Sequence, residues 1–310
     1  MNETPIDPDI IELLDELGPA GNVRAADQTT GELRQGMRDA IAVFTRNARA
    51  VAVHQVTDDK VRGIPVRVYR PERPTAVIVY LHGGAWTTGD LDTHDLVTRR
   101  MCRDTGAVVV AVDYRMLPEH PFPAPFDDAW DAMVWARALH PELPFLIAGD
   151  SAGGTLAACV ALRARDEGGP RIDAQILIYP AIDDDLDRPS MKAFSDGKRV
   201  AIEDLRFFLG QYVAPEAAAG SAYALPGRAT SLAGLPPALL AIAGHDLLRS
   251  AEEDYARRLR EAGVGVTVQL DAEQVHGWID YAARVPSADQ AFGRLMEHVN
   301  DLISRVTVAA

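Results

Sequence analysis

The chain has 310 residues, of which 47% are apolar and 6% aromatic, and its formal net charge is −14. Such a chain is long enough to bury a large core, whereas its acidity argues against a nucleic-acid partner, because phosphate binding needs a basic surface. The two cysteines, Cys102 and Cys159, form neither a disulfide framework nor a metal-ligand spacing. No apolar signal core or membrane-length run is present. We therefore expect a cytoplasmic protein with no metal site and no membrane span.

Two helices are expected before the first strand. Asp7 followed by Pro8 is typical of an N-cap and a first-turn proline, and Gly18 is typical of a helix end. Residues 31–49 carry apolar side chains at spacings of three and four, which predicts a second, amphipathic helix.

From residue 51 onward the pattern is that of strands. Runs at 51–57 and 64–69 predict an antiparallel hairpin whose turn lies at the polar residues 58–60. Farther along, runs that are apolar throughout alternate with helix-length segments, which indicates a mostly parallel sheet buried on both faces. The expected strands are 77–81, 107–112, 145–148, 176–179, 238–243 and 264–270. The expected helices are 91–105, 125–139, 151–165, 251–262 and 288–306.

Residues 183–228 interrupt this alternation with an acidic run, a helical patch and an alanine-rich stretch. An insertion between two sheet strands at this point lies beyond the carboxyl ends of the strands, where open α/β sheets bind ligands. We expect it to form a helical cap together with residues 1–50, over a catalytic domain made of residues 51–182 and 229–310. An ordinary surface excursion is the alternative.

The stretch Gly149-Asp150-Ser151-Ala152-Gly153 carries the most chemical information. An apolar strand precedes it and an alanine-rich helical pattern follows, which is the setting of the G-x-S-x-G nucleophile elbow. The flanking glycines let strand and helix approach around a strained turn that exposes the serine Oγ. The alternative is a tight turn with a capping serine.

A serine nucleophile requires a base, and the base requires an orienting acid. In the order Ser, acid, His, each after a strand, Asp246 is the expected acid and His276 the expected base. Asp183 is the second choice for the acid, although it opens the insertion. His245 as the base would leave no acid at a strand end between it and Ser151.

Donors for the oxyanion are expected on the loop after an early strand, where small residues let backbone N–H groups come near the serine. The run from His82 to Trp86 is such a loop. The expected donors are the N–H groups of Gly84, Ala85 and Ala152, with Gly83 as a further candidate. His82 is expected to support this loop, with Asp90 as its hydrogen-bond partner.

Aromatic residues near these motifs are candidates for the substrate pocket. Trp86 and Trp278 flank the oxyanion loop and the base, while Phe207, Phe208 and Tyr212 occur in the insertion at near-helical spacing. Routine core packing is the alternative for all of them.

Taken together, five ordered motifs resemble the hormone-sensitive-lipase-like family of α/β-hydrolases, also called bacterial family IV esterases, from about residue 74 to the C-terminus. The motifs, in this chain, are His82-Gly83-Gly84-Ala85-Trp86, Asp113 through Ala124, Gly149 through Gly154, Asp246-Leu247-Leu248-Arg249 and His276-Gly277-Trp278. The resemblance implies a carboxylesterase with a helical cap, a preference for short acyl esters, no cofactor, and in many members a homodimer through the last strand.

Three departures from the family pattern stand out. Ala85 replaces a glycine, which matters only if its φ is positive. Leu247 replaces a proline, and residues 271–274 differ ahead of the base, which alters the path of the base loop and the substrate rim. The same triad also serves an amidase, a lactone or carbamate hydrolase, or an acyltransferase, and a ligand-binding receptor is the alternative outside catalysis.

Overall fold

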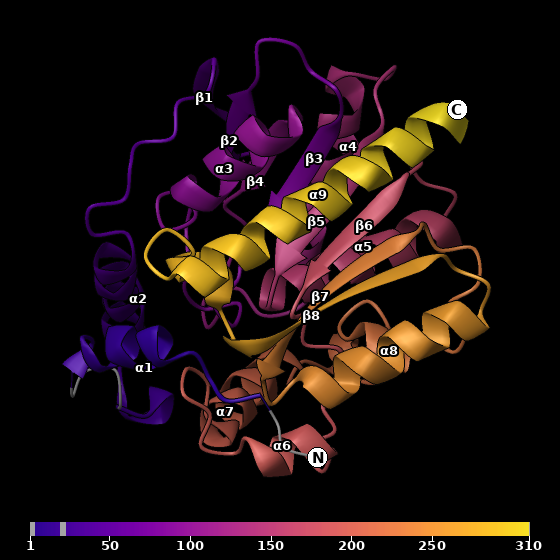
Figure 1. The fold of residues 1–310 in the computed structure, drawn as a ribbon. Coiled ribbons are helices and arrows are strands. Elements are labelled where there is room, and N and C mark those ends of the chain that lie inside the picture. Colours follow the sequence, from indigo (N-terminus) through magenta and orange to yellow (C-terminus); the bar gives the residue numbers. More distant parts are fainter. Residues whose placement is uncertain (1–3, 19–22, 310) are drawn as a thin grey trace.

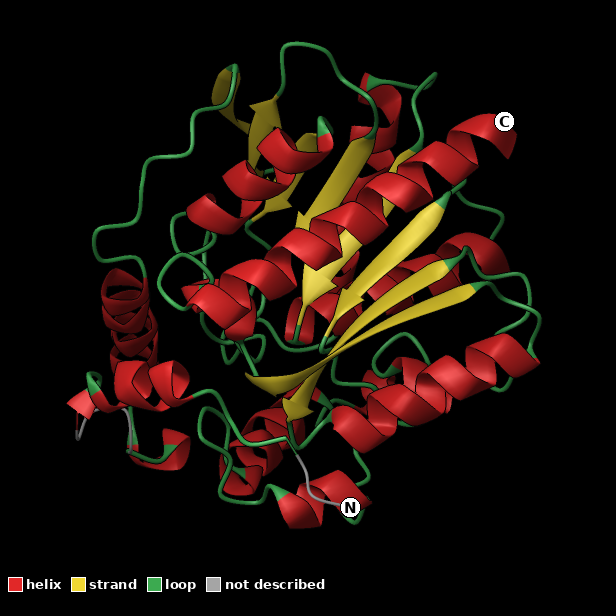
Figure 2. Cartoon of the chain, viewed as in Figure 1, coloured by secondary structure: helices red, strands yellow, loops and turns green. Residues whose placement is uncertain are grey.

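An eight-stranded sheet forms the centre of the protein, which is described here by a computed structural model of residues 4–18 and 23–309. The strand order is β1-β2-β4-β3-β5-β6-β7-β8. The strands are β1 (Gln55–Val61), β2 (Ile64–Arg70), β3 (Val77–Leu81), β4 (Val108–Val112), β5 (Phe145–Asp150), β6 (Ala174–Ile178), β7 (Ala238–His245) and β8 (Val266–Val275). Antiparallel pairing is confined to β1–β2 and β2–β4, and every other neighbouring pair is parallel. The carboxyl ends of the parallel strands therefore meet at one edge (Figure 2).

Helices cover both faces of the sheet, which explains why β3, β4, β5 and β6 are buried along their whole length. α3 (Asp95–Thr105) and α9 (Pro286–Ala309) pack on one face, and α4 (Ala124–Leu139), α5 (Ala152–Asp166) and α8 (Arg249–Glu261) on the other (Figure 1). Within the described ranges, no helix is long and apolar enough to cross a membrane.

The remaining helices gather beyond the carboxyl ends of the strands (Figure 1). They are α1 (Pro8–Asp15), α2 (Thr30–Phe44), α6 (Pro189–Ala193) and α7 (Ile202–Tyr212), with the short 3-10 turns η2 (Ala25–Asp27), η3 (Glu216–Ala218), η4 (Pro226–Arg228) and η5 (Trp278–Tyr281). The segment before β1 and the segment between β6 and β7 are in contact, because the Ala25 N–H donates to Asp204 Oδ1 of α7 at 2.8 Å. The pocket described below lies between them and the sheet.

The fold class is confirmed, with differences at element boundaries. The hairpin turn lies at Arg62 and Gly63, both at positive φ, and the predicted turn at residues 58–60 is wrong. A two-residue turn of this hand matches the twist of the strands, and the polar residues 58–60 are tolerated because β1 is an edge strand with an exposed face. α1 ends at Asp15, ahead of the predicted Gly18, and β8 extends five residues past its predicted end at residue 270, to Val275.

Candidate active site

The nucleophile elbow joins β5 to α5 at the carboxyl edge of the sheet. Ser151 has φ 51° and ψ −120°, a strained conformation for a residue with a side chain. The glycines on either side permit the turn: a Cβ on Gly149 would lie 2.3 Å from the Gly153 carbonyl oxygen, and one on Gly153 would lie 1.9 Å from that of Leu81. Only hydrogen fits at either position, so the motif spacing follows from the close approach of strand and helix.

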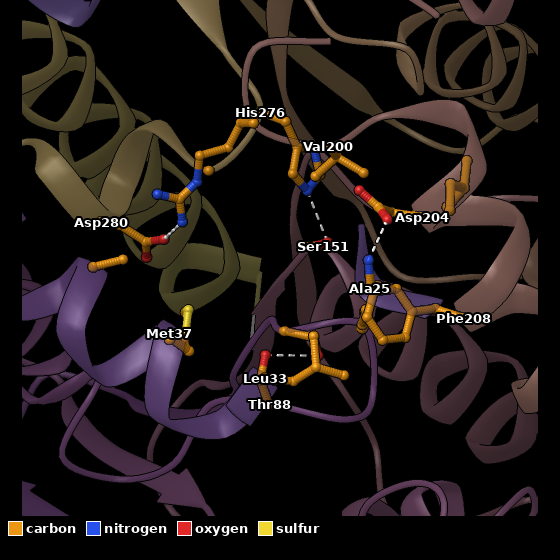
Figure 3. A pocket seen from close by; sticks show the side chains of 18 of the residues that line it. Ala25, Leu33, Met37, Thr88, Ser151, Val200, Asp204, Phe208, His276 and Asp280 are labelled. Carbon is orange, nitrogen blue, oxygen red and sulfur yellow. Dashed lines mark hydrogen bonds and ion pairs between the residues drawn. The ribbon is translucent and has the colours of Figure 1, made fainter. Parts of the chain in front are cut away.

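Three side chains from three strand ends meet at this elbow. His276 follows β8, and its Nε2 lies 2.9 Å from Ser151 Oγ (Figure 3). Its Nδ1 lies 2.6 Å from Oδ2 of Asp246, which follows β7. A carboxylate only accepts hydrogen bonds, so Nδ1 carries the proton and Nε2 is free to accept one from the serine. This arrangement can deprotonate Ser151 and hold the resulting imidazolium.

The acid is itself held in place by the chain around it. Asp246 is 1% exposed, and its Oδ1 accepts the Leu248 N–H at 2.9 Å. The two alternatives for acid and base lie elsewhere: His245 Nε2 contacts the Thr4 carbonyl at 2.7 Å, and Asp183 pairs with Arg188. Of these candidates, Asp246 and His276 are the two that the structure connects to Ser151 by hydrogen bonds.

The loop after β3 approaches the elbow with an unusual backbone. Gly84, Ala85 and Trp86 have φ of 115°, 53° and 56°, and a Cβ on Gly84 would lie 2.2 Å from the Thr88 carbonyl oxygen. Ala85, which stands where the family motif has a glycine, has its backbone in the left-handed region. An L-residue there costs about 1–2 kcal/mol.

The loop leaves two of its N–H groups free for a ligand. Within the part of the chain that the structure describes, no hydrogen bond uses the N–H of Gly84 or Ala85. The Ala152 N–H opens α5, where helix geometry provides no intrahelical acceptor. Gly83 differs from the expectation, because its N–H already donates to Asp150 Oδ1 at 2.8 Å. It anchors the loop and drops out of the expected donors.

His82 supports this loop, as the sequence predicts, through other partners than expected. Its Nδ1 donates to the Gly83 carbonyl at 2.8 Å, and its ring stacks on Tyr114, whose hydroxyl donates to the His82 carbonyl at 2.6 Å. Burial and the neighbouring His94 lower the pKa of His82 to about 4, so this ring is neutral. The predicted bond to Asp90 is wrong: that carboxylate accepts the backbone N–H of Thr93 and the guanidinium of Arg38.

A cavity of about 390 Å³ opens in front of Ser151. Trp86 lines it, as expected, and so does Phe208. Three predicted pocket residues are not among those that line it. Trp278 is fully buried against Tyr179 in the core, Phe207 packs edge-on against Phe208, and Tyr212 stacks on Trp86 with ring centroids 4.0 Å apart. Their large aromatic side chains pack against other aromatic residues, which is the alternative that the sequence left open.

Sequence reasoning missed most of the pocket wall. Leu33 and Met37 of α2 lie on one side, and Val200 lies on the other, where the predicted base His276 also is (Figure 3). The α2 residues were recognisable as an apolar stripe, but periodicity does not say what such a stripe covers. Arg199, whose Nη2 lies 2.6 Å from Asp280 Oδ2, also lines the cavity and had no signal in the sequence.

Several curated relatives and solved structures similar to this chain are esterases. The α/β-hydrolase fold family matches residues 78–280. The chain is 42% identical over 249 residues to the carboxylesterase NlhH of Mycobacterium tuberculosis, covering 76% of this chain and 77% of the relative. It is 38% identical over 303 residues to the esterase LipI of the same species, covering 93% and 92%.

A solved structure agrees with these relatives. The hyperthermophilic esterase of the archaeon Pyrobaculum calidifontis superposes with a TM-score of 0.87 at 33% identity, covering 96% of this chain and 99% of the other. The match therefore covers nearly the whole chain. The chain belongs to the α/β-hydrolase family and is a carboxylesterase of its hormone-sensitive-lipase-like branch.

Proposed function

We propose that this carboxylesterase works through an acyl-enzyme on Ser151. The single observation that carries the proposal is the relay from Ser151 Oγ to His276 Nε2 at 2.9 Å and from His276 Nδ1 to Asp246 at 2.6 Å. His276 takes the serine proton as Oγ attacks the ester carbonyl carbon. When the tetrahedral intermediate collapses, the leaving alcohol takes that proton, and water then repeats the sequence to release the acid.

The N–H groups of Gly84, Ala85 and Ala152 are the donors that we propose for the oxyanion. They belong to the two backbone segments that meet at the serine, the loop after β3 and the start of α5. Donors fixed by the backbone need no reorganisation as charge develops, and losing one typically costs about 3–4 kcal/mol in the transition state.

The preferred substrates are esters of short acyl chains. The cavity of about 390 Å³ must hold both the acyl and the alcohol group. On the side of the oxyanion loop Trp86 bounds it, and Tyr212 of α7 backs this indole with a parallel ring at 4.0 Å. Residues 1–50 and 183–228 act as the cap that encloses this space, which fits the contact between Ala25 and Asp204.

Hydrolysis of p-nitrophenyl esters from acetyl to dodecanoyl tests both parts of the proposal. Ser151→Ala should lower kcat by roughly 10⁴- to 10⁶-fold, and a fluorophosphonate should label the wild type but not this variant. Ser304→Ala, an exposed serine of α9, is the matched control and should leave kcat unchanged. A variant at Ser151 that keeps most of the activity contradicts the nucleophile, and a maximum at about ten carbons or more contradicts the short-chain preference.

A further inference from the structure

A buried cluster of ionisable side chains lies behind the oxyanion loop, and the relay does not use it. His94, 1% exposed at the start of α3, places its Nε2 3.7 Å from Oδ1 of Asp150 and 3.9 Å from Oδ1 of Asp280. The two carboxylates are 4% and 7% exposed and come from β5 and η5. Elements distant in sequence thus bring one imidazole between two buried acids.

The groups on the two sides of the ring are compatible with a proton on each of its nitrogens. Thr93 Oγ1 has a single hydrogen, which it can donate to the Asp90 carbonyl at 2.9 Å. The same oxygen lies 3.0 Å from His94 Nδ1, and with its own hydrogen on the Asp90 carbonyl it accepts a hydrogen bond from a protonated Nδ1. Nε2 faces Asp150 Oδ1, which already accepts the Tyr80 hydroxyl at 2.6 Å and the Gly83 N–H at 2.8 Å. At 3.7 Å the two atoms form no hydrogen bond, and the carboxylate acts on the ring through its charge, which favours a proton on Nε2 as well.

Charge balance leads to the same state. Arg199 pairs with Asp280, whereas the structure gives Asp150 no ion pair other than the one to His94 within its described ranges. A carboxylate without a counter-ion is very costly to bury. Burial by itself lowers the pKa of His94, but the carboxylates of Asp150 and Asp280 outweigh it and raise that pKa above 6.5.

The groups facing the imidazole come from every element around it. Burial opposes the ionised form of Asp150, but His94 and the Tyr80 hydroxyl hold its pKa below 3.8. Burial raises the pKa of Asp280, against the pull of Arg199 and His94. The remaining neighbours are the neutral ring of His82, with centroids 5.4 Å apart, and the more distant carboxylate of Asp90.

We propose that His94 is a positioning residue. As an imidazolium it holds the Asp150 carboxylate in place, and Asp150 anchors the oxyanion loop. On its other side it attracts Asp280, which pairs with Arg199 in the pocket wall. The proposal rests on the oxyanion role of Gly84 and Ala85, because Asp150 acts on that loop through the Gly83 N–H. Arg199, in turn, lies 4.6 Å over the ring of Phe44 at the end of α2. One buried cation therefore connects the elbow, the oxyanion loop and the cap.

Two measurements test this. In protein labelled with ¹⁵N-histidine, both ring nitrogens of His94 should be protonated at pH 7, with the signal assigned by its absence in His94→Gln or by its contacts with the Tyr80 and His82 rings. This readout does not depend on catalysis, so it separates a failure of this proposal from a failure of the acyl-enzyme mechanism. A neutral His94 at pH 7 would overturn the proposal.

His94→Gln should lower kcat about tenfold or more and change KM by less than about twofold, because the oxyanion donors act in the transition state. The His94 charge is present below its folded-state pKa and is lost as pH rises through it. The wild type should therefore lose kcat on the alkaline side, in a step that His94→Gln lacks. Thr98→Val, one turn along α3 and equally buried, is the control and should keep the wild-type kcat and pH profile. A wild-type kcat in folded His94→Gln would also overturn the proposal.

Discussion

The relay and the oxyanion loop lie side by side at one sheet edge but are built differently. The relay consists of three side chains, from the ends of β5, β7 and β8, that contact one another directly. The proposed oxyanion loop offers only backbone N–H groups, in a left-handed conformation. Remote side chains hold it directly at Gly83 and Thr87, and indirectly through Leu117, whose N–H donates to the Trp86 carbonyl. The difference teaches that a motif can locate both parts, whereas which backbone N–H groups stay free depends on what packs around the loop.

The strongest test of the relay is Asp246→Asn. An amide in this position favours the wrong tautomer of His276, so kcat should fall by about 10⁴-fold, with the fold intact by circular dichroism. Asp183→Asn removes the rival carboxylate and should keep kcat within about twofold. If Asp183→Asn showed the larger loss, the acid would be misassigned.

The corresponding test of the oxyanion loop acts from a distance. Arg34 of α2 donates from Nε to the Thr87 carbonyl at 3.0 Å and from Nη2 to the Leu117 carbonyl at 2.9 Å, and it also pairs with Glu119. Arg34→Ala should misplace the loop and lower kcat about 10- to 100-fold, measured at saturating ester.

Glu119→Gln is the matched control for Arg34. It removes the charge of an exposed ion pair and leaves both bonds to the backbone carbonyls, so kcat should change by less than about twofold. Equal losses in the two variants would mean that the ion pair with Glu119, and not the hydrogen bonds from Arg34 to the backbone carbonyls, positions the donors.

A buried glutamate near Asp246 should make the stability of the protein depend on pH. Glu252 of α8 is fully buried, and burial and the charge of Asp246 raise its pKa well above 4.5. At pH values between the ordinary pKa of 4.5 and the raised pKa of the folded state, the folded protein holds one proton more than the unfolded chain. The free energy of unfolding therefore falls as pH rises through this window. Glu252→Gln should therefore raise Tm by roughly 2 °C or more at pH 8 and progressively less toward pH 5, measured by calorimetry.

Glu253→Gln, at the exposed neighbouring position, is the control for this effect and should follow the wild-type dependence on pH. A constant offset of Glu252→Gln at all pH values would show that the change acts through packing and not through the proton.

The smallest effect is expected at Ala85. Relief of its positive φ offsets the entropy that glycine adds to the unfolded chain, so Ala85→Gly should leave the free energy of unfolding unchanged or raise it by up to about 1 kcal/mol. Ala42→Gly, at an exposed position in α2, should lower it by about 1 kcal/mol. Urea titration of both variants measures the contrast, and equal losses would contradict the strain.

Much of this architecture could be predicted because periodicity and glycine spacing are local. Buried parallel strands are apolar throughout, and the elbow needs glycines two residues on either side of Ser151. The hairpin turn was misplaced for a physical reason: β1 is an edge strand, so Asp58 and Asp59 are tolerated within it and imitate a turn.

The sequence by itself determined the family, the alternation of strands and helices, and the strands after which Ser151, Asp246 and His276 occur, whereas the backbone donors for an oxyanion stay a prediction. Only the tertiary structure decided that the Gly83 N–H donates to Asp150, that Trp278 and Tyr212 pack away from the cavity, and that His94 lies between two carboxylates. The direction in which a side chain points, and the charge that it carries, depend on neighbours from remote segments. Those neighbours come together only when the sheet and its helices pack.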